Sequence, residues 1–196
     1  DSSPSRGLGD VYKRQSEARR LGITVTEVDV TNLAEVQTAL KSKPRLLLVE
    51  TISNPLTRIA NLPALAEMTQ SSKTLLVVDN TFATPLGCQP LTLGADLVIE
   101  SMSKLMNGHG DLMLGLIAGK ERGWDRIRQT VAAWGFASSP FDCWLAERGS
   151  PHSGYASREL SITLRLSPSC SRATPRWMKS STRACLHTPT MNWHLS

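Results

Sequence analysis

One stretch of the sequence combines an amine with hydroxyl groups and a glycine-rich turn. It reads ESMSKLMNGHGD over residues 100–111, and in it Lys104 follows Ser101 and Ser103. Most lysine amines are solvated surface groups, but a lysine can also act as a nucleophile toward a carbonyl carbon. The neighbouring groups decide which of these two roles is the better interpretation.

Two further polar clusters precede this stretch, and each follows a short apolar run. Asp79 and Thr81 come at and after the end of TLLVVD, and Asn54 comes shortly after RLLLVE. Each of these alone is weak evidence, because Asp and Asn after a strand are usually turn or capping residues. Three clusters at strand ends favour a shared ligand, because open parallel sheets bind ligands at the carboxyl ends of their strands.

The elements that must position these residues alternate between strand and helix. We predict strands over four β-branched or apolar stretches, namely residues 23–30, 45–50, 74–80 and 96–101. Asn32 is predicted to cap a helix over 33–42, and Asn61 a helix over 62–70. A further helix after residue 121 carries apolar residues at three- and four-residue spacing. This alternation predicts an α/β fold with a mostly parallel sheet and flanking helices.

Pyridoxal phosphate fits the groups at the predicted strand ends. Its aldehyde condenses with a lysine amine, and its ring nitrogen stays protonated beside a carboxylate. Its phosphate needs short hydroxyl donors near the lysine, which Ser101 and Ser103 supply. The sequence fits a dinucleotide or a nucleoside triphosphate less well, since it has no GxGxxG after the first strand and no GxxxxGK[ST] motif.

Three motifs in order resemble one known family. They are VETISNP, LLVVDNTFATPLGCQPLTLGADLVIESMSKLMNGHGDLMLGLIAG and SPFDCWLAERG. They resemble the Cys/Met-metabolism enzymes that depend on pyridoxal phosphate, a family with cystathionine γ-lyase, cystathionine γ-synthase, methionine γ-lyase and cystathionine β-lyase among its members. The resemblance implies the fold of aspartate-aminotransferase-type enzymes, with residues 16–150 forming the central part of the large, cofactor-binding domain.

The resemblance also implies roles for individual residues around the cofactor. By that likeness the residues are Lys104 for the Schiff base, Asp79 for the ring nitrogen, Ser101 and Ser103 for the phosphate, Asn54 near the ring hydroxyl and Thr81 beside the ring. His109 matches a glycine–histidine turn of the family, to which we assign a structural role. No residue is expected to bind a metal.

The activity implied is transsulfuration chemistry on a small amino acid. The substrate would be cystathionine, homocysteine or methionine, or an O-acyl homoserine, and the reaction a β- or γ-elimination or a γ-replacement. The intact family implies a homo-oligomer, either a dimer or a tetramer. The alternative is a truncated, non-catalytic α/β fragment with weak or no cofactor binding, because the family's N-terminal and C-terminal substrate-gripping parts have no match here.

Composition excludes several other classes of protein. The formal net charge is +5, but residues 16–150 carry 13 Lys or Arg and 14 Asp or Glu, so the folded part lacks the basic surface of a nucleic-acid binder. No apolar run reaches the ~18–20 residues of a membrane helix. Four cysteines without CxxC spacing indicate free thiols and a cytoplasmic protein.

The two ends differ from the middle in composition. Residues 1–15 are expected to be a non-native or disordered leader. Residues 151–196 contain 18 Ser, Thr or Pro and carry six Arg or Lys against one Glu. We interpret this tail as frameshifted or disordered, and assign no function to either end.

Overall fold

The computed structural model describes residues 16–54, 56–120 and 124–149. The expectations for the leader and the tail, and the cysteines at 170 and 185, lie outside these residues. The described part contains a four-stranded sheet in the order β1-β2-β3-β4. Its strands are β1 (Leu46–Glu50), β2 (Leu75–Asp79), β3 (Leu97–Ser101) and β4 (Gly115–Gly119). The first three are parallel, and β4 runs antiparallel to β3.

Helices and turns lie before, between and after the strands. They are α2 (Leu33–Leu40), α3 (Leu62–Ser72), α4 (Thr84–Gly87), α5 (Trp124–Ala133) and α6 (Pro140–Gly149), with a 3₁₀ turn at Pro90–Leu93 and a π turn at Met102–Met106. The Asn32 side chain accepts a hydrogen bond from the backbone N–H of Glu35, and Asn61 caps α3 in the same way. These two predicted caps are confirmed. The helix predicted after residue 121 is α5.

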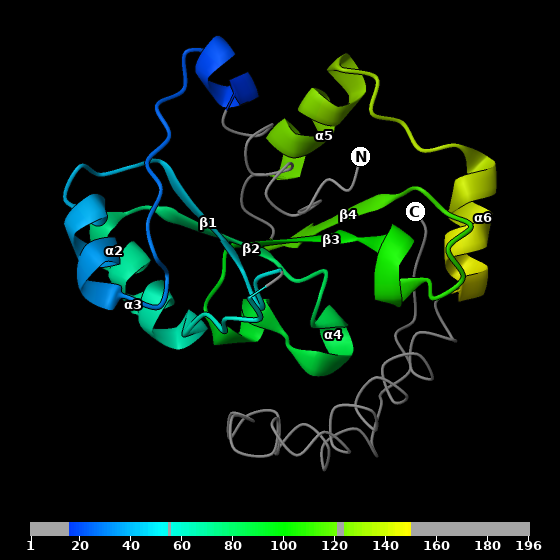
Figure 1. The fold of residues 1–196 in the computed structure, drawn as a ribbon. Helices are drawn as coiled ribbons and strands as arrows, with labels where there is room; N and C mark the ends of the chain where they lie inside the picture. Colours follow the sequence, from blue (N-terminus) through cyan, green and yellow to red (C-terminus); the bar gives the residue numbers. More distant parts are fainter. Residues whose placement is uncertain (1–15, 55, 121–123, 150–196) are drawn as a thin grey trace, which may run out of the picture.

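The sheet has one well-covered face. Figure 1 shows α2, α3 and α4 on one side of the sheet and α5 on the other. The main core lies between the sheet and α2 and α3, where Val36, Leu65, Leu76 and Val78 are fully buried. A second, smaller cluster forms around Met102, Leu112, Leu145 and Ala146, and joins the π turn to α6.

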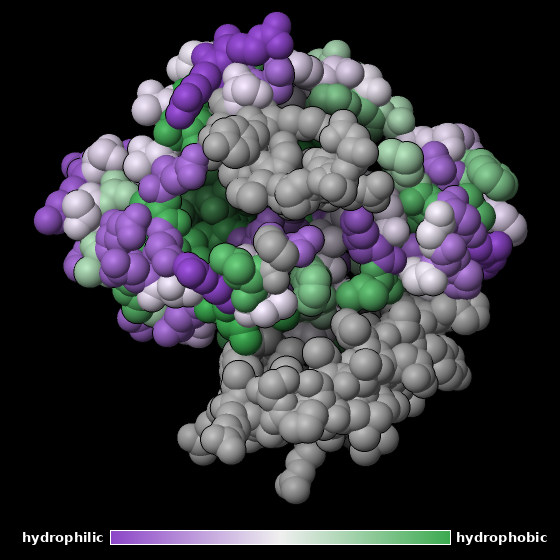
Figure 2. Space-filling model, viewed as in Figure 1, coloured by the Kyte–Doolittle hydropathy of each residue, from purple (hydrophilic) through white to green (hydrophobic). Residues whose placement is uncertain are grey.

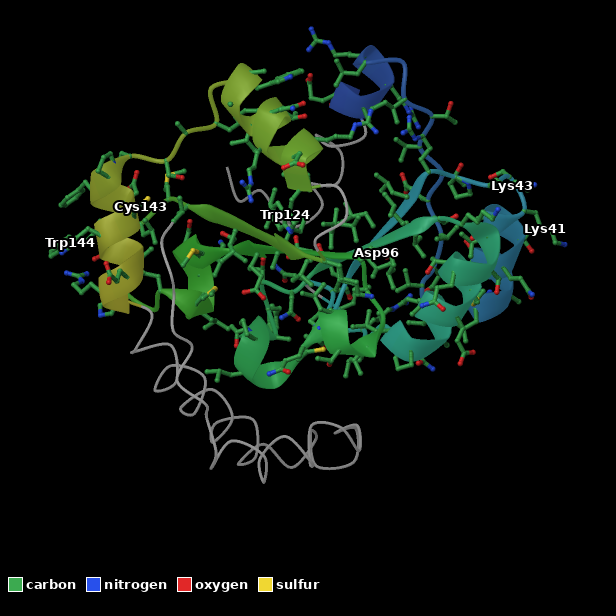
Figure 3. The ribbon with its side chains drawn as sticks, turned by 180° about the vertical axis from the view of Figure 1, so that it is seen from behind. Lys41, Lys43, Asp96, Trp124, Cys143 and Trp144 are labelled. Carbon is green, nitrogen blue, oxygen red and sulfur yellow. The ribbon has the colours of Figure 1, made fainter. Side chains whose placement is uncertain are left out.

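Among the described residues, fewer elements cover the opposite face of the sheet. Side chains on this face include several exposed apolar ones: Leu46 (53 % exposed), Leu48 (39 %), Leu75 (50 %) and Ile117 (43 %). Helix α5 lies on this side but has no buried residue of its own, although the Trp124 indole N–H donates to the Gly119 carbonyl at 3.3 Å. Figure 3 shows Trp124 at this junction of α5 with β4. The apolar stripe that identified α5 therefore does not form a core contact.

One predicted strand is wrong. Residues 23–29 have no regular secondary structure, although Val28 and Val30 pack against the core. The segment is separated from the edge strand β1 by a recess of about 60 Å³, lined by Thr26, Val28, Leu46 and Leu47 among others. Figure 2 shows hydrophobic residues gathered around a hollow on this side of the molecule. A strand needs a neighbour to satisfy its backbone groups, and this segment has none in the described part of the chain.

Candidate functional site

The carboxyl ends of β1, β2 and β3 lie side by side at one edge of the fold. In the parallel register Glu50 pairs with Asp79, and Asp79 pairs with Ile99. Side chains alternate between faces along a strand, so Glu50, Asp79 and Ser101 project on the same, less covered face. Lys104 follows Ser101 by three residues. The structure therefore brings Asp79 and Ser101 to one face at adjacent strand ends, and Lys104 lies in the turn that follows Ser101.

Lys104 lies in the π turn that follows β3. Its backbone angles (φ −100°, ψ −135°) are not helical and interrupt the turn, and the residue is exposed. Its carbonyl oxygen accepts a hydrogen bond from the Gly108 N–H at 3.0 Å. The neighbouring Ser103 hydroxyl oxygen accepts from the Leu114 N–H at 3.3 Å. These contacts fix the backbone on both sides of the lysine and leave its side chain at the surface.

Asp79, Thr81 and Ser101 form a short series of hydrogen bonds between β2 and β3. The Thr81 N–H donates to the Asp79 carboxylate at 3.1 Å, and the Ser101 N–H donates to the Thr81 hydroxyl oxygen at 2.8 Å. Thr81 thus connects the two strand ends through its side chain. The sequence alone did not indicate this structural role of Thr81.

Asn54 follows β1 in an exposed position. Its backbone N–H donates to the Glu50 carboxylate at 3.2 Å, which closes a tight loop after the strand. Asn54 therefore lies at the same edge of the sheet as Asp79, one strand further out.

A buried polar network lies directly behind these residues on the covered face. Asn80 is fully buried, and its amide group donates to the Cys88 carbonyl at 3.0 Å and to Glu100 at 2.9 Å. Its side-chain oxygen accepts from the Thr51 hydroxyl at 2.8 Å. Burial, together with the charge of Glu100, raises the pKa of the Cys88 thiol to about 11. The network joins the ends of β1, β2 and β3, and none of its members was among the predicted site residues.

A sequence signal for this network did exist. Asn80 and Glu100 are polar residues at or near the ends of runs otherwise made of buried aliphatic residues. Polar residues at such positions are hydrogen-bonded in most folded proteins, so each predicts a partner on a neighbouring strand. The sequence does not say which partner, because that depends on the strand order.

The turn after the lysine packs against the end of α6. The buried Asn107 amide donates to Asp111 at 2.7 Å, and Arg148 forms an ion pair with the same carboxylate. The hydrogen bond from Asn107, together with Arg148, holds the pKa of Asp111 below its usual range. A Cβ added at Gly149 would fall on the Asn107 side-chain oxygen and lie 3.0 Å from its carbonyl oxygen. Only glycine therefore allows this close approach.

His109 belongs to the same turn. Its Nδ1 atom lies 2.7 Å from the Asn107 carbonyl oxygen. This local contact agrees with the structural role assigned to His109.

Other kinds of site find no support among the described residues. No group of three or more His, Cys, Asp or Glu side chains there could hold a metal ion. No helix in the described ranges is long and apolar enough to cross a membrane. Cys88 and Cys143 are free thiols, the first buried and the second exposed on α6, where Figure 3 shows it beside Trp144.

The fold is an open α/β sheet with polar groups at the carboxyl ends of its parallel strands, which is where such folds bind ligands. The chain belongs to the Cys/Met metabolism PLP-dependent enzyme family, whose model matches residues 11–151. Pyridoxal phosphate is the cofactor of that family.

Relatives with curated functions include several kinds of lyase. The chain is 40 % identical over 132 residues to a canavanine γ-lyase from Rhizobium leguminosarum bv. trifolii, covering 67 % of this chain and 33 % of the relative. It is 46 % identical over 110 residues to an L-methionine γ-lyase from Fusobacterium nucleatum, covering 56 % and 28 %. It is 39 % identical over 144 residues to a cystathionine γ-lyase from Bacillus subtilis, covering 72 % and 38 %. The chain thus spans about a third of the length of these relatives.

Solved structures agree with this membership. A cystathionine γ-synthase from Xanthomonas oryzae, in complex with aminoacrylate and cysteine, matches with a TM-score of 0.72 and 34 % identity over 75 % of this chain and 38 % of its own. A cystathionine γ-lyase from Lactobacillus plantarum, in complex with L-serine, matches with a TM-score of 0.73 and 30 % identity over 82 % and 44 %. The predicted fold class is therefore confirmed.

Proposed function

We propose that this chain is the lysine-bearing part of an enzyme that uses pyridoxal phosphate in sulfur-amino-acid metabolism. The reaction would be a β- or γ-elimination or a γ-replacement at a small amino acid, with Lys104 as the reactive amine. The observation that carries the proposal is the register of the sheet. It puts Asp79 and Ser101 on one face at adjacent strand ends, with Lys104 three residues further along.

The groups at this edge fit the chemistry of the cofactor. A carboxylate suits a protonated ring nitrogen, short hydroxyl groups suit a phosphate, and an exposed amine suits an aldehyde. Asp79, Ser101 and Lys104 supply one of each kind. We assign Ser103 to the phosphate and Asn54 and Thr81 to the surroundings of the ring. The Ser103 hydroxyl also accepts from the Leu114 N–H and the Thr81 hydroxyl from the Ser101 N–H, while the Asn54 contact to Glu50 uses only its backbone N–H.

The residues of this chain would bind the cofactor and transfer protons. Pyridoxal phosphate, when bound, supplies the electron sink that makes the α-proton of an amino acid acidic. Lys104 Nζ would then take that proton and later return it, as a general acid and base. Asp79 would hold a proton on the ring nitrogen. The hydrogen bond from the Thr81 N–H helps to orient that carboxylate.

The substrate and the oligomeric state of the whole protein are proposed from its relatives. The names of the relatives include canavanine, methionine and cystathionine, so the family membership of this chain leaves the amino acid open. We propose a sulfur-containing amino acid or an O-acyl homoserine, and a homo-oligomeric whole protein. These assignments concern the whole protein, because this chain spans only about a third of the length of the relatives.

Trapping the cofactor on the lysine tests the proposal. The purified chain is incubated with pyridoxal phosphate, its visible absorbance is recorded, and the sample is reduced with borohydride and digested for mass spectrometry. We expect a visible band and a phosphopyridoxyl group on Lys104. Lys104→Ala should lose both, whereas Lys120→Ala, which removes an exposed lysine directly after β4, should keep them.

The alternative function is a non-catalytic α/β fragment. The exposure of Lys104 favours it, since the described residues by themselves do not enclose the amine. Labelling spread equally over several lysines, and unchanged by Lys104→Ala, would support this alternative. Turnover of cystathionine, methionine or O-succinylhomoserine is expected to be low in either case, because two thirds of the relatives' length is absent from this chain.

A further inference from the structure

Glu100 is a carboxyl group in an apolar environment. Its side chain lies on the helix-covered face of β3, next to Ser101, and is 5 % exposed. Among the described residues, none of the ion pairs of Lys or Arg includes Glu100. Burial raises the pKa of this carboxyl group, and the negative charge of Asp79 raises it further, against the lowering effect of the Asn80 hydrogen bond.

A single hydrogen bond fixes this carboxyl group. The Asn80 amide donates to Oε1 at 2.9 Å, while Oε2 is buried without a hydrogen-bond partner in the described part of the chain. The same amide also contacts the Cys88 carbonyl and the Thr51 hydroxyl. Removing Oε1 would leave one buried N–H of Asn80 without an acceptor, which is costly in an apolar environment.

Asn80 directly follows Asp79, and this places Glu100 behind the candidate site. The Asn80 backbone N–H donates to the Ile99 carbonyl at 2.9 Å, one residue before Glu100. The Ser101 backbone N–H donates to the Thr81 hydroxyl at 2.8 Å. The ends of β2 and β3 are therefore joined by two bonds from backbone N–H groups, and Glu100 adds a contact between side chains on the covered face.

We propose that Glu100 is a positioning residue for the cofactor site, because its hydrogen bond to Asn80 fixes the end of β2, with Asp79, against the end of β3, with Lys104. Glu100 does not touch the cofactor in this proposal. It acts through Asn80 on the relative position of the carboxylate and the amine. The inference rests on the proposed function, since it concerns the same pair of residues.

Two substitutions separate the hydrogen bond from the shape of the side chain. Glu100→Gln keeps an oxygen that accepts from Asn80, and Glu100→Met fills a similar volume without that oxygen. The dissociation constant of pyridoxal phosphate is measured from the Lys104-dependent visible band, under conditions in which circular dichroism shows each chain to be folded. We expect Glu100→Gln to bind within about twofold of the wild type and Glu100→Met about tenfold more weakly, because the contact that holds the end of β2 against the end of β3 is lost.

A matched control excludes simple loss of stability. Val98 lies two residues earlier on the same face of β3 and is equally buried, at 4 % exposed, but has no polar side-chain contact. Val98→Ala should lower the urea midpoint while leaving the dissociation constant within about twofold of the wild type. If Glu100→Met does not fold, Glu100→Leu takes its place, and Glu100→Gln must still bind like the wild type.

The possible outcomes distinguish this inference from the proposed function. A wild-type chain without a Lys104-dependent band overturns the proposed function, and the role of Glu100 with it. A wild-type band with equal affinity in Glu100→Met overturns only the role of Glu100. The same holds if Glu100→Gln binds as weakly as Glu100→Met, or if Val98→Ala binds as weakly as both.

Discussion

Replacing Asn80 by alanine should destabilise the fold more than any exposed Asn→Ala change. The substitution removes three buried hydrogen bonds, to the Thr51 hydroxyl, the Cys88 carbonyl and the Glu100 carboxyl group. At ~1 kcal/mol net for each bond, the loss is about 3 kcal/mol, before any contribution from the cavity. Urea unfolding followed by circular dichroism measures this loss. With an m-value of about 2 kcal/mol per molar urea, the midpoint should fall by about 1.5 M.

Asn61→Ala is the matched control for this prediction. Asn61 is exposed and makes one capping hydrogen bond, to the Ala64 N–H at 3.3 Å. Loss of a helix cap costs about 1 kcal/mol, so the urea midpoint should fall by about 0.5 M. If the two variants unfold within ~0.2 M urea of each other, the buried network contributes no more than an exposed cap. The reasoning about Asn80 and about Glu100 would then be refuted together.

The remaining predictions concern pH, packing and thiol reactivity. The pKa of Glu100 is raised above its ordinary value of 4.5. The stability that the protonated carboxyl group contributes is therefore complete below pH 4.5 and is lost as the pH rises through the folded-state pKa. Between pH 4.5 and 9, the urea midpoint of the wild type should fall relative to that of Glu100→Gln. Gly149→Ala at the end of α6 should destabilise by about 1–3 kcal/mol in urea unfolding, because its Cβ meets the buried Asn107 side chain. Gly115→Ala, with no atom within 4 Å of its Cβ, should not. Iodoacetamide at pH 8 should label the exposed Cys143 at least tenfold faster than Cys88, whose thiol has a pKa of about 11, as read by peptide mass spectrometry.

The elements set by local chemistry were predictable from the sequence. Asn32 and Asn61 begin helices because a side-chain oxygen next to an apolar helical pattern satisfies the first N–H groups. The ends of β1, β2 and β3 were also predictable, because buried parallel strands are apolar along their length and the first polar residue after such a run marks the end of the strand. The candidate site could therefore be located before the order of the strands was known.

The errors arise where a distant part of the chain decides the structure. Residues 23–30 have the composition of a strand but lie beside a recess and not beside a neighbouring strand. The strand β4 was not predicted, because its five residues begin and end with glycine and its pairing with β3 is antiparallel. Helix α5 was predicted, but none of its residues is buried in the described part of the chain. The secondary-structure propensity of the residues cannot predict any of these three features, because each depends on which other segments lie nearby.

The alternation of side chains along two strands explains why the candidate site and the buried network occur together. Asp79 and Asn80 are consecutive, as are Glu100 and Ser101, so one member of each pair faces the open side and the other faces the core. A slip of β3 by one residue against β2 would bury Ser101 and expose Glu100, which exchanges the two faces completely. The hydrogen bond between Asn80 and Glu100 exists only in the observed register. The contact that stabilises the core is therefore also the contact that selects the register in which Asp79 and Ser101 share a face with access to a ligand.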